Sequence, residues 1–166
     1  MKPLAYLTFM ALLALLATPI AAQDEGQISE LGYLDKQYMQ QQRDALNDLA
    51  SRNFGNGFNG TTEHDIELLQ RILDQKLIRP DQTQELQAMG IILGDLLATD
   101  LDLHWVIFED KMGRSRALRY RQTDEYLFPV TMISRRREAN NLTSVKSIYQ
   151  KAYDTIAASK PALPFS

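Results

Sequence analysis

The chain has 166 residues, a length typical of one domain, with a formal net charge of −3 and no cysteine. The lack of cysteine excludes disulfide bonds and thiolate metal sites from this sequence. The negative overall charge argues against a nucleic-acid-binding protein, whose domains are usually basic.

The first 22 residues have the pattern of a secretory signal peptide. Lys2 provides a positive charge, the run from Leu4 to Leu16 is apolar apart from Thr8, and small residues then precede the polar sequence QDEGQ. The apolar run is shorter than the ~20 residues that a helix needs to cross a bilayer. We therefore expect cleavage after Ala22 and a periplasmic or secreted protein that keeps no integral membrane segment. An uncleaved membrane anchor is the alternative.

Residues 23–61 are expected to form an N-terminal helix followed by a glycine-rich loop. The helix is predicted from Ser29 to Arg52, because apolar residues recur there at helical spacing: Leu31, Leu34, Tyr38, Ala45 and Leu49. The sequence NFGNGFNG then ends the helix, since three closely spaced glycines favour a loop.

Two further helices are predicted before the next change of pattern. One begins near Thr62 and ends before Pro80, which cannot continue a helix. The other, from Gln82 to Asp100, is the most apolar part of the mature chain and is expected to be central. Gly90 and Gly94 lie one turn apart in it and leave a flat stripe, which we expect to pack closely onto the sheet.

The stretch LHWVIFED, from Leu103 to Asp110, predicts a strand covered on both faces, with Trp105 on one of them. Gly113 follows in a turn, and RSRALRYRQ predicts the antiparallel return strand. A third strand is predicted in LFPVTMISRRRE, with Pro129 near its start, where a missing N–H donor is tolerated.

A final helix is predicted from Thr143 or Ser144 onward. Its inward-facing residues are expected to be Val145, Ile148, Tyr149, Ala152 and Ile156. Residues 62–160 are thus expected to form an α+β domain, and residues 161–166 a tail. The whole chain is expected to hold three N-terminal helices, a three-stranded antiparallel meander and one C-terminal helix.

No convincing catalytic set is present. The weak candidates are Asp95, His104 and Asp110, which would act as carboxylate and imidazole groups in a hydrolase. His104 and Asp110 are about 20 Å apart along one straight strand, so they cannot touch each other there. His64 and His104 are far apart in the sequence, and a catalytic zinc normally has three protein ligands. We therefore expect neither a metal nor a cofactor.

The charge is distributed unevenly. From Lys111 to Arg137 there are eight basic residues and two acidic ones, whereas the rest of the mature chain is acidic. Arginine suits carboxylate or phosphate groups, so we expect an unknown protein or anionic ligand to bind at a group of arginines: Arg114, Arg116, Arg119, Arg135 and Arg136. The alternative is that these arginines neutralise the acidic helices of the same molecule. Tyr120, Tyr126 and Phe128 lie nearby, either as recognition residues or as core.

The sequences AMGIILGDLL, HWVIFEDKMGRSRALRY and FPVTMISRRRE resemble the bacterial domain of unknown function 3806 family. The resemblance extends from about Gln84 to Tyr153. It depends on paired glycines in a helix, a tryptophan in the following strand, an acid and a glycine at the turn, and a proline before arginines: Gly90, Gly94, Trp105, Asp110, Gly113, Pro129, Arg135 and Arg136. The resemblance implies a fold, and it brings no established activity or ligand.

Three functions remain open from the sequence. The first is a non-enzymatic exported domain that binds a partner through the arginine-bearing sheet. The second is a small hydrolase with a site between the third helix and the sheet. The third is a protein that lies on an anionic membrane surface through its arginines.

Overall fold

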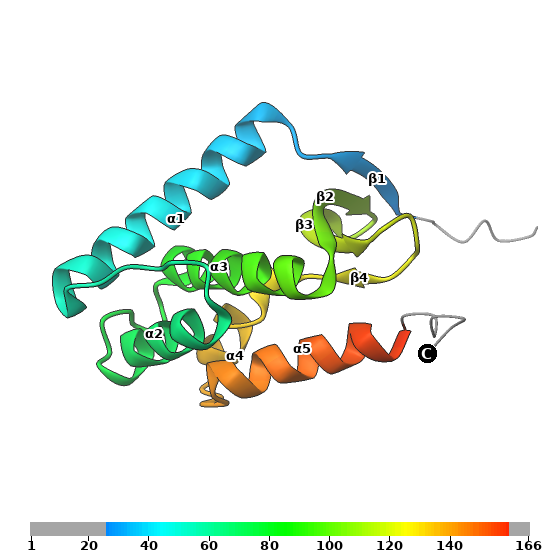
Figure 1. The fold of residues 1–166 in the computed structure, drawn as a ribbon. Coiled ribbons are helices and arrows are strands. Elements are labelled where there is room, and N and C mark those ends of the chain that lie inside the picture. The colour runs from blue at the N-terminus through cyan, green and yellow to red at the C-terminus, as the bar shows by residue number, and fades with distance from the viewer. Residues whose placement is uncertain (1–25, 160–166) are drawn as a thin grey trace, which may run out of the picture.

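The computed structural model describes residues 26–159, so the predicted signal peptide and the tail at 161–166 lie outside the described residues. The fold is α+β, as the sequence predicts, with a four-stranded antiparallel sheet beside the helices (Figure 1). In chain order the elements are β1 (Gln27–Glu30), α1 (Tyr33–Phe54), α2 (Thr62–Asp74), α3 (Thr83–Leu101), β2 (Leu103–Asp110), β3 (Gly113–Tyr120), β4 (Tyr126–Leu127), the 3-10 helix η1 (Pro129–Thr131), α4 (Ser134–Glu138) and α5 (Val145–Ser159).

The β2–β3 hairpin forms the centre of the sheet. Its register pairs Leu103 with Tyr120 at one end and Asp110 with Gly113 at the other. Gly113 has a φ of 119°, a value that glycine adopts without steric cost, so the two strands can reverse over two residues. The predicted strand, turn and return strand are therefore confirmed in this hairpin.

The sheet has a fourth strand that the sequence prediction missed. β1 pairs with β2 from Gln27↔Glu109 to Glu30↔Val106. The first helix consequently begins at Tyr33 and not at Ser29. Gly32 separates the two elements in an extended conformation, with a φ of −68° and a ψ of 169°.

The predicted third strand is short. β4 pairs with β3 at two positions, Leu118↔Leu127 and Arg119↔Tyr126. If β4 continued in the same register, residue 129 would lie opposite Arg116, and this would be the next pair able to exchange backbone hydrogen bonds. Pro129 has no N–H to donate there, and the chain leaves the sheet as η1 and α4.

The predicted inward face of the first helix is wrong by about one residue. Leu34 is 75% exposed, whereas the buried side of α1 is formed by Asp35, Met39, Gln42, Leu46 and Ala50. Two of these buried residues are polar, because they meet polar partners on other elements. Asp35 receives hydrogen bonds from Arg114, and the Gln42 side chain lies 3.5 Å from that of Gln84.

α3 is the central element, as predicted, with α1 on one side and α2 and α5 on the other (Figure 1). Leu86, Met89, Leu93 and Leu97 are fully buried in it. The inward face predicted for the last helix, from Val145 to Ile156, is likewise buried in α5. Full burial of such side chains contributes about 1.5–3 kcal/mol each, so α3 and its neighbours supply most of the hydrophobic stabilisation.

The two glycines of α3 receive different neighbours. A Cβ atom on Gly90 would lie 2.4 Å from the Val130 carbonyl oxygen, which belongs to η1. A Cβ on Gly94 would lie 2.4 Å from the Trp105 ring in β2. The expected close packing onto the sheet therefore holds at Gly94, while at Gly90 the approaching backbone is that of η1.

Within residues 26–159, none of the helices combines the length and the apolar character that a membrane span requires.

Candidate functional site

Three of the five predicted binding arginines line one groove. This groove lies beside the first half of β3, between the β2–β3 turn and the η1–α4 segment, and has a volume of about 390 Å³. We call it the arginine groove, and its lining residues are Gln87, Phe108, Asp110, Met112, Arg114, Ser115, Arg116, Phe128, Val130, Thr131 and Arg135. The uneven charge of the sequence therefore corresponds to a concave surface.

A buried carboxylate from α1 holds two of these arginines. The Arg114 guanidinium donates to both oxygens of Asp35, at 3.0 and 2.6 Å, and Arg116 Nη2 lies 2.9 Å from Asp35 Oδ1. The Arg116 guanidinium also stacks 4.5 Å from the centre of the Tyr38 ring. Part of the arginine charge thus neutralises a helix of the same molecule, as the alternative reading of the sequence expects.

The hydrogen bonds from Arg114 hold the pKa of Asp35 below its ordinary value, and the charges of Arg114 and Arg116 act in the same direction against the opposing effect of burial. A carboxyl group with a lowered pKa stabilises the folded state above its unfolded pKa, and this contribution is lost as the pH falls through the folded pKa. We expect Asp35→Asn to reduce the free energy of unfolding at pH 7 and this reduction to shrink below about pH 4.

Urea unfolding of the wild type and Asp35→Asn from pH 3 to pH 7 measures this difference. Asp124→Asn is the control, because the Asp124 side chain is 99% exposed and lies 3.9 Å from its nearest arginine. A wild-type advantage over Asp35→Asn that stayed constant down to pH 3 would contradict the assignment.

Arg135 is the arginine of the groove with the most freedom to bind a ligand. Its side chain is exposed on α4, and within residues 26–159 no carboxylate forms an ion pair with it. Arg114 is about half exposed, at 46% of its side chain, so it can accept a further anionic partner beside Asp35. Three carboxylates lie near these guanidinium groups: Asp35, Asp110 and Glu109, which stands opposite Arg114 on β2. The attraction for an anionic partner therefore depends mainly on Arg135 and on the exposed part of Arg114.

The other two predicted binding arginines lie elsewhere. Arg119 belongs to the opposite face of the sheet, where its Nε donates to the Thr123 carbonyl and its guanidinium lies over the Tyr126 ring. Arg136 donates to the Met132 carbonyl at 2.5 Å within its own segment and does not line the groove. The predicted arginines therefore do not form a single flat surface, which removes the basis for docking all of them on a membrane.

An aromatic wall closes the side of the groove opposite the Asp35 carboxylate. The rings of Phe108 and Phe128 meet edge to face with their centres 5.5 Å apart, and Phe108 meets Tyr126 at 5.1 Å. Phe128 is 38% exposed, so part of its apolar surface faces the groove. Tyr120, in contrast, is buried in the core. The sequence alone did not distinguish the roles of Tyr120, Tyr126 and Phe128, because all three lie between Arg119 and Arg135 in the chain.

The three weak catalytic candidates line three different hollows. Asp95 lies near Phe58 and Thr99, His104 lies near Glu30 and Arg121, and Asp110 belongs to the arginine groove. The Asp110 side chain stabilises the β2–β3 turn, since its carboxylate accepts the Met112 backbone N–H at 2.7 Å. This arrangement gives no support to a hydrolase that uses the three groups together.

Asp95 connects three elements. It accepts two hydrogen bonds from the Arg43 guanidinium of α1, at 2.7 and 2.8 Å, and one from Trp105 Nε1 of β2 at 3.0 Å. This network satisfies the indole N–H of a largely packed tryptophan and pairs a partly buried arginine. The role of Asp95 is therefore to join α1, α3 and β2.

The histidines offer no metal centre. His64 Nδ1 lies 2.8 Å from Asp65, whose buried carboxylate also accepts the backbone N–H groups of Asn59 and Gly60. This group fixes the glycine-rich loop onto the start of α2. Across residues 26–159 there is no set of three or more His, Cys, Asp or Glu side chains that could hold a metal ion.

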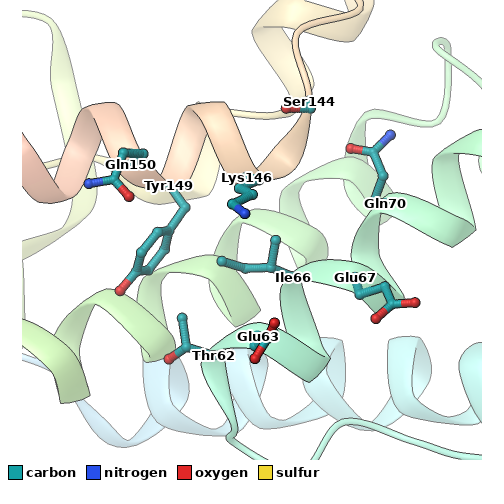
Figure 2. A pocket seen from close by; sticks show the side chains of 9 residues that line it. All are labelled: Thr62, Glu63, Ile66, Glu67, Gln70, Ser144, Lys146, Tyr149 and Gln150. Atoms are coloured by element: carbon teal, nitrogen blue, oxygen red, sulfur yellow. The ribbon is translucent and has the colours of Figure 1, made fainter.

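A larger hollow of about 630 Å³ lies between α2 and α5. Figure 2 shows Tyr149 of α5 extending toward Thr62 of α2, with Ile66 nearby. Tyr149 and Thr62 both donate to the same oxygen of Asp100. Burial, followed by the hydrogen bond and charge of Asp100, raises the pKa of Tyr149 far above its ordinary value, so the phenol stays protonated and cannot serve as a base. The charged residues that line this hollow are Glu63, Glu67 and Lys146 (Figure 2), so it has no group of arginines like that of the arginine groove.

Four of the eight family-like residues of the sequence meet at one junction: Gly90, Gly94, Trp105 and Pro129. The Trp105 ring and the Pro129 ring both lie against Gly94, while the carbonyl groups of Pro129 and Val130 lie against Gly90. The family model described as "Domain of unknown function (DUF3806)" matches residues 65–149, slightly more than half of the chain. The chain belongs to the DUF3806 family. The match also includes α2, which the resemblance in the sequence had left out, whereas β1 and α1 lie outside it.

A crystal structure from Bacteroides thetaiotaomicron VPI-5482, determined at 1.50 Å resolution, shares the fold of this DUF3806 protein. The TM-score is 0.71 at 18% sequence identity, and the similarity covers 78% of this chain and 48% of that one. The DUF3806 chain thus spans about half the length of that protein, and the likeness concerns the fold alone. A comparison with curated proteins found no similar sequence.

Proposed function

We propose that the protein is an exported, non-enzymatic binding module whose arginine groove receives an acidic segment of a partner protein. The N-terminal pattern of residues 1–22 supports export. The observation that carries the binding role is the convergence of Arg114, Arg116 and Arg135 on one groove with an apolar wall at Phe128. Charged groups that select a partner and an apolar surface that anchors it are the two components of a protein-binding site.

The probe for this proposal is a capped hexapeptide of alternating glutamate and valine, with a lysine–valine peptide of the same length as the comparison. We expect the acidic peptide to bind more tightly than the basic one, and its affinity to fall as salt is added, since the groove contacts are partly exposed. Arg135→Glu should lower the affinity about tenfold or more, because it replaces attraction by repulsion at the groove. Isothermal titration calorimetry measures both effects.

Arg79→Glu is the matched control. Arg79 is likewise an exposed arginine, but it pairs with Asp81 and lies outside the arginine groove. Its charge reversal should leave peptide affinity within about twofold of the wild type, because Arg79 does not contact the peptide. The two variants change the net charge of the protein equally, so a difference between them reports on the groove alone. Equal binding of the acidic and basic peptides, or an Arg135→Glu protein that bound as tightly as Arg79→Glu, would sink the proposal.

A further inference from the structure

The arginine groove contains an open edge of the sheet. β4 pairs with β3 at Leu118 and Arg119, and the part of β3 from Gly113 to Ala117 has no strand partner on that side among the described residues. An unpaired strand edge presents a row of N–H and C=O groups that another extended chain can complete. The groove residues Arg114, Ser115 and Arg116 belong to this open stretch.

The hydrogen bonds of the neighbouring residues show which backbone groups face the open side. The Tyr120 N–H donates to the Glu125 carbonyl at 3.2 Å, on the side of β3 where β4 lies. Every second residue of a strand directs its N–H and C=O groups to the same side. Tyr120 directs its groups toward β4, so Arg114 and Arg116 direct theirs to the same side, where they face the groove. Two donors and two acceptors are therefore available to a bound strand.

The two faces of this edge differ in chemistry. The Arg114 and Arg116 side chains lie on the face that meets Asp35 of α1. Ser115 lies on the other face, opposite Phe108, whose ring contacts Phe128. Successive side chains of an added strand would alternate between an arginine side and an aromatic side.

We infer that the protein binds its partner by strand addition: an extended segment with alternating acidic and apolar residues pairs antiparallel to β3 at Arg114 and Arg116. This inference rests on the proposed function and specifies its mode. The acidic side chains face Arg114, Arg116 and Arg135, and the apolar side chains cover Phe108 and Phe128. Main-chain hydrogen bonds supply affinity, and the alternating side chains supply specificity. The antiparallel direction continues the ladder that β4 begins.

The charges argue for a foreign segment and against a second copy of this strand. If two β3 edges paired antiparallel about Ser115, Arg114 of one copy would lie opposite Arg116 of the other. Like charges directly opposite each other on paired strands are destabilising. A partner with carboxylates at these positions removes that repulsion and attracts the exposed guanidinium groups of Arg114 and Arg135.

Backbone N-methylation of the glutamate–valine hexapeptide tests the inference. In antiparallel pairing, the glutamates opposite Arg114 and Arg116 donate their N–H groups to β3, while the valine N–H groups point away. Methylating the backbone nitrogens of two of its three glutamates, the two placed opposite Arg114 and Arg116, should weaken binding to the wild-type protein about tenfold or more, since each methyl removes a hydrogen bond and blocks close approach. Methylating two valine nitrogens should leave the affinity within about threefold, because those groups make no bond to β3.

The outcomes separate the mode of binding from the binding itself. If the acidic peptide binds and depends on Arg135, but both methylated forms bind equally well, strand addition is overturned while the proposed function stands. The reverse methylation pattern would also overturn the antiparallel register. If the unmethylated acidic peptide binds no better than the basic one, the proposed function fails first.

Discussion

Replacing Gly90 by alanine should destabilise the protein by about 2–3 kcal/mol, as overpacking of a filled core does. The added Cβ would lie 2.4 Å from the Val130 carbonyl oxygen and 2.5 Å from that of Pro129. Both are backbone atoms, so the clash cannot be relieved by rotating a side chain. α3 and η1 would have to separate, and the surrounding packing would be disturbed.

The sign of this effect is diagnostic. Helix propensity alone predicts that alanine in place of a mid-helix glycine would stabilise the protein by about 1 kcal/mol. Gly32→Ala is the control, because the nearest atom to its added Cβ is 3.5 Å away and its φ is −68°. Urea unfolding of the two variants gives the comparison. A Gly90→Ala protein at least as stable as the wild type would show that η1 does not press against α3 in solution.

Asp95→Ala is expected to have the second largest effect, a loss of about 2–3 kcal/mol, since it leaves both an arginine and an indole N–H without their acceptor. The Arg43 and Asp95 side chains are 26% and 33% exposed, so water recovers part of the loss that a fully buried pair would suffer. Chemical denaturation followed by the fluorescence of Trp105, the one tryptophan in the chain, measures it directly.

An exposed pair of the same composition is available for comparison. Arg79 and Asp81 share one hydrogen bond of 3.0 Å, and their side chains are 67% and 73% exposed. Asp81→Ala should change stability by less than about 0.5 kcal/mol, as is usual for surface pairs. Combining Asp95→Ala with Arg43→Met should recover part of the loss, because the unpaired charge is then removed. Equal effects of Asp95→Ala and Asp81→Ala would contradict the joining role of Asp95.

Hydrophobic periodicity predicted the elements whose burial is apolar. α3, α5 and the β2–β3 hairpin follow the expected spacing, since leucine, isoleucine and valine residues form their inward faces. α1 is different, because its buried face includes Asp35 and Gln42, which periodicity assigns to solvent. Their burial depends on partners such as Arg114, 79 residues further along the chain, and such a pairing has no local signal.

β1 and the end of the sheet were missed for local reasons. QISE has four residues, one of them strongly apolar, and only Leu31 and Gly32 separate it from the sequence that favours helix. Pro129 was placed at the start of a strand, whereas it marks the point at which the strand ends. The sequence located the arginines that line the groove but not which of them meet there. That outcome depends on strand alternation at Arg119 and on the short turn of α4 that directs Arg136 back to Met132.

Pro129 has two structural roles that only proline combines, because one depends on its ring and the other on its missing N–H. Its ring lies against Gly94 of α3, and its lack of an N–H leaves the backbone groups of Arg116 without a partner in β4. A residue with a backbone N–H at position 129 would allow the chain to continue as a strand beside β3 and to fill the arginine groove. The unpaired edge of β3 and the close packing of Pro129 on α3 thus both depend on one proline, so natural selection on either property constrains the other.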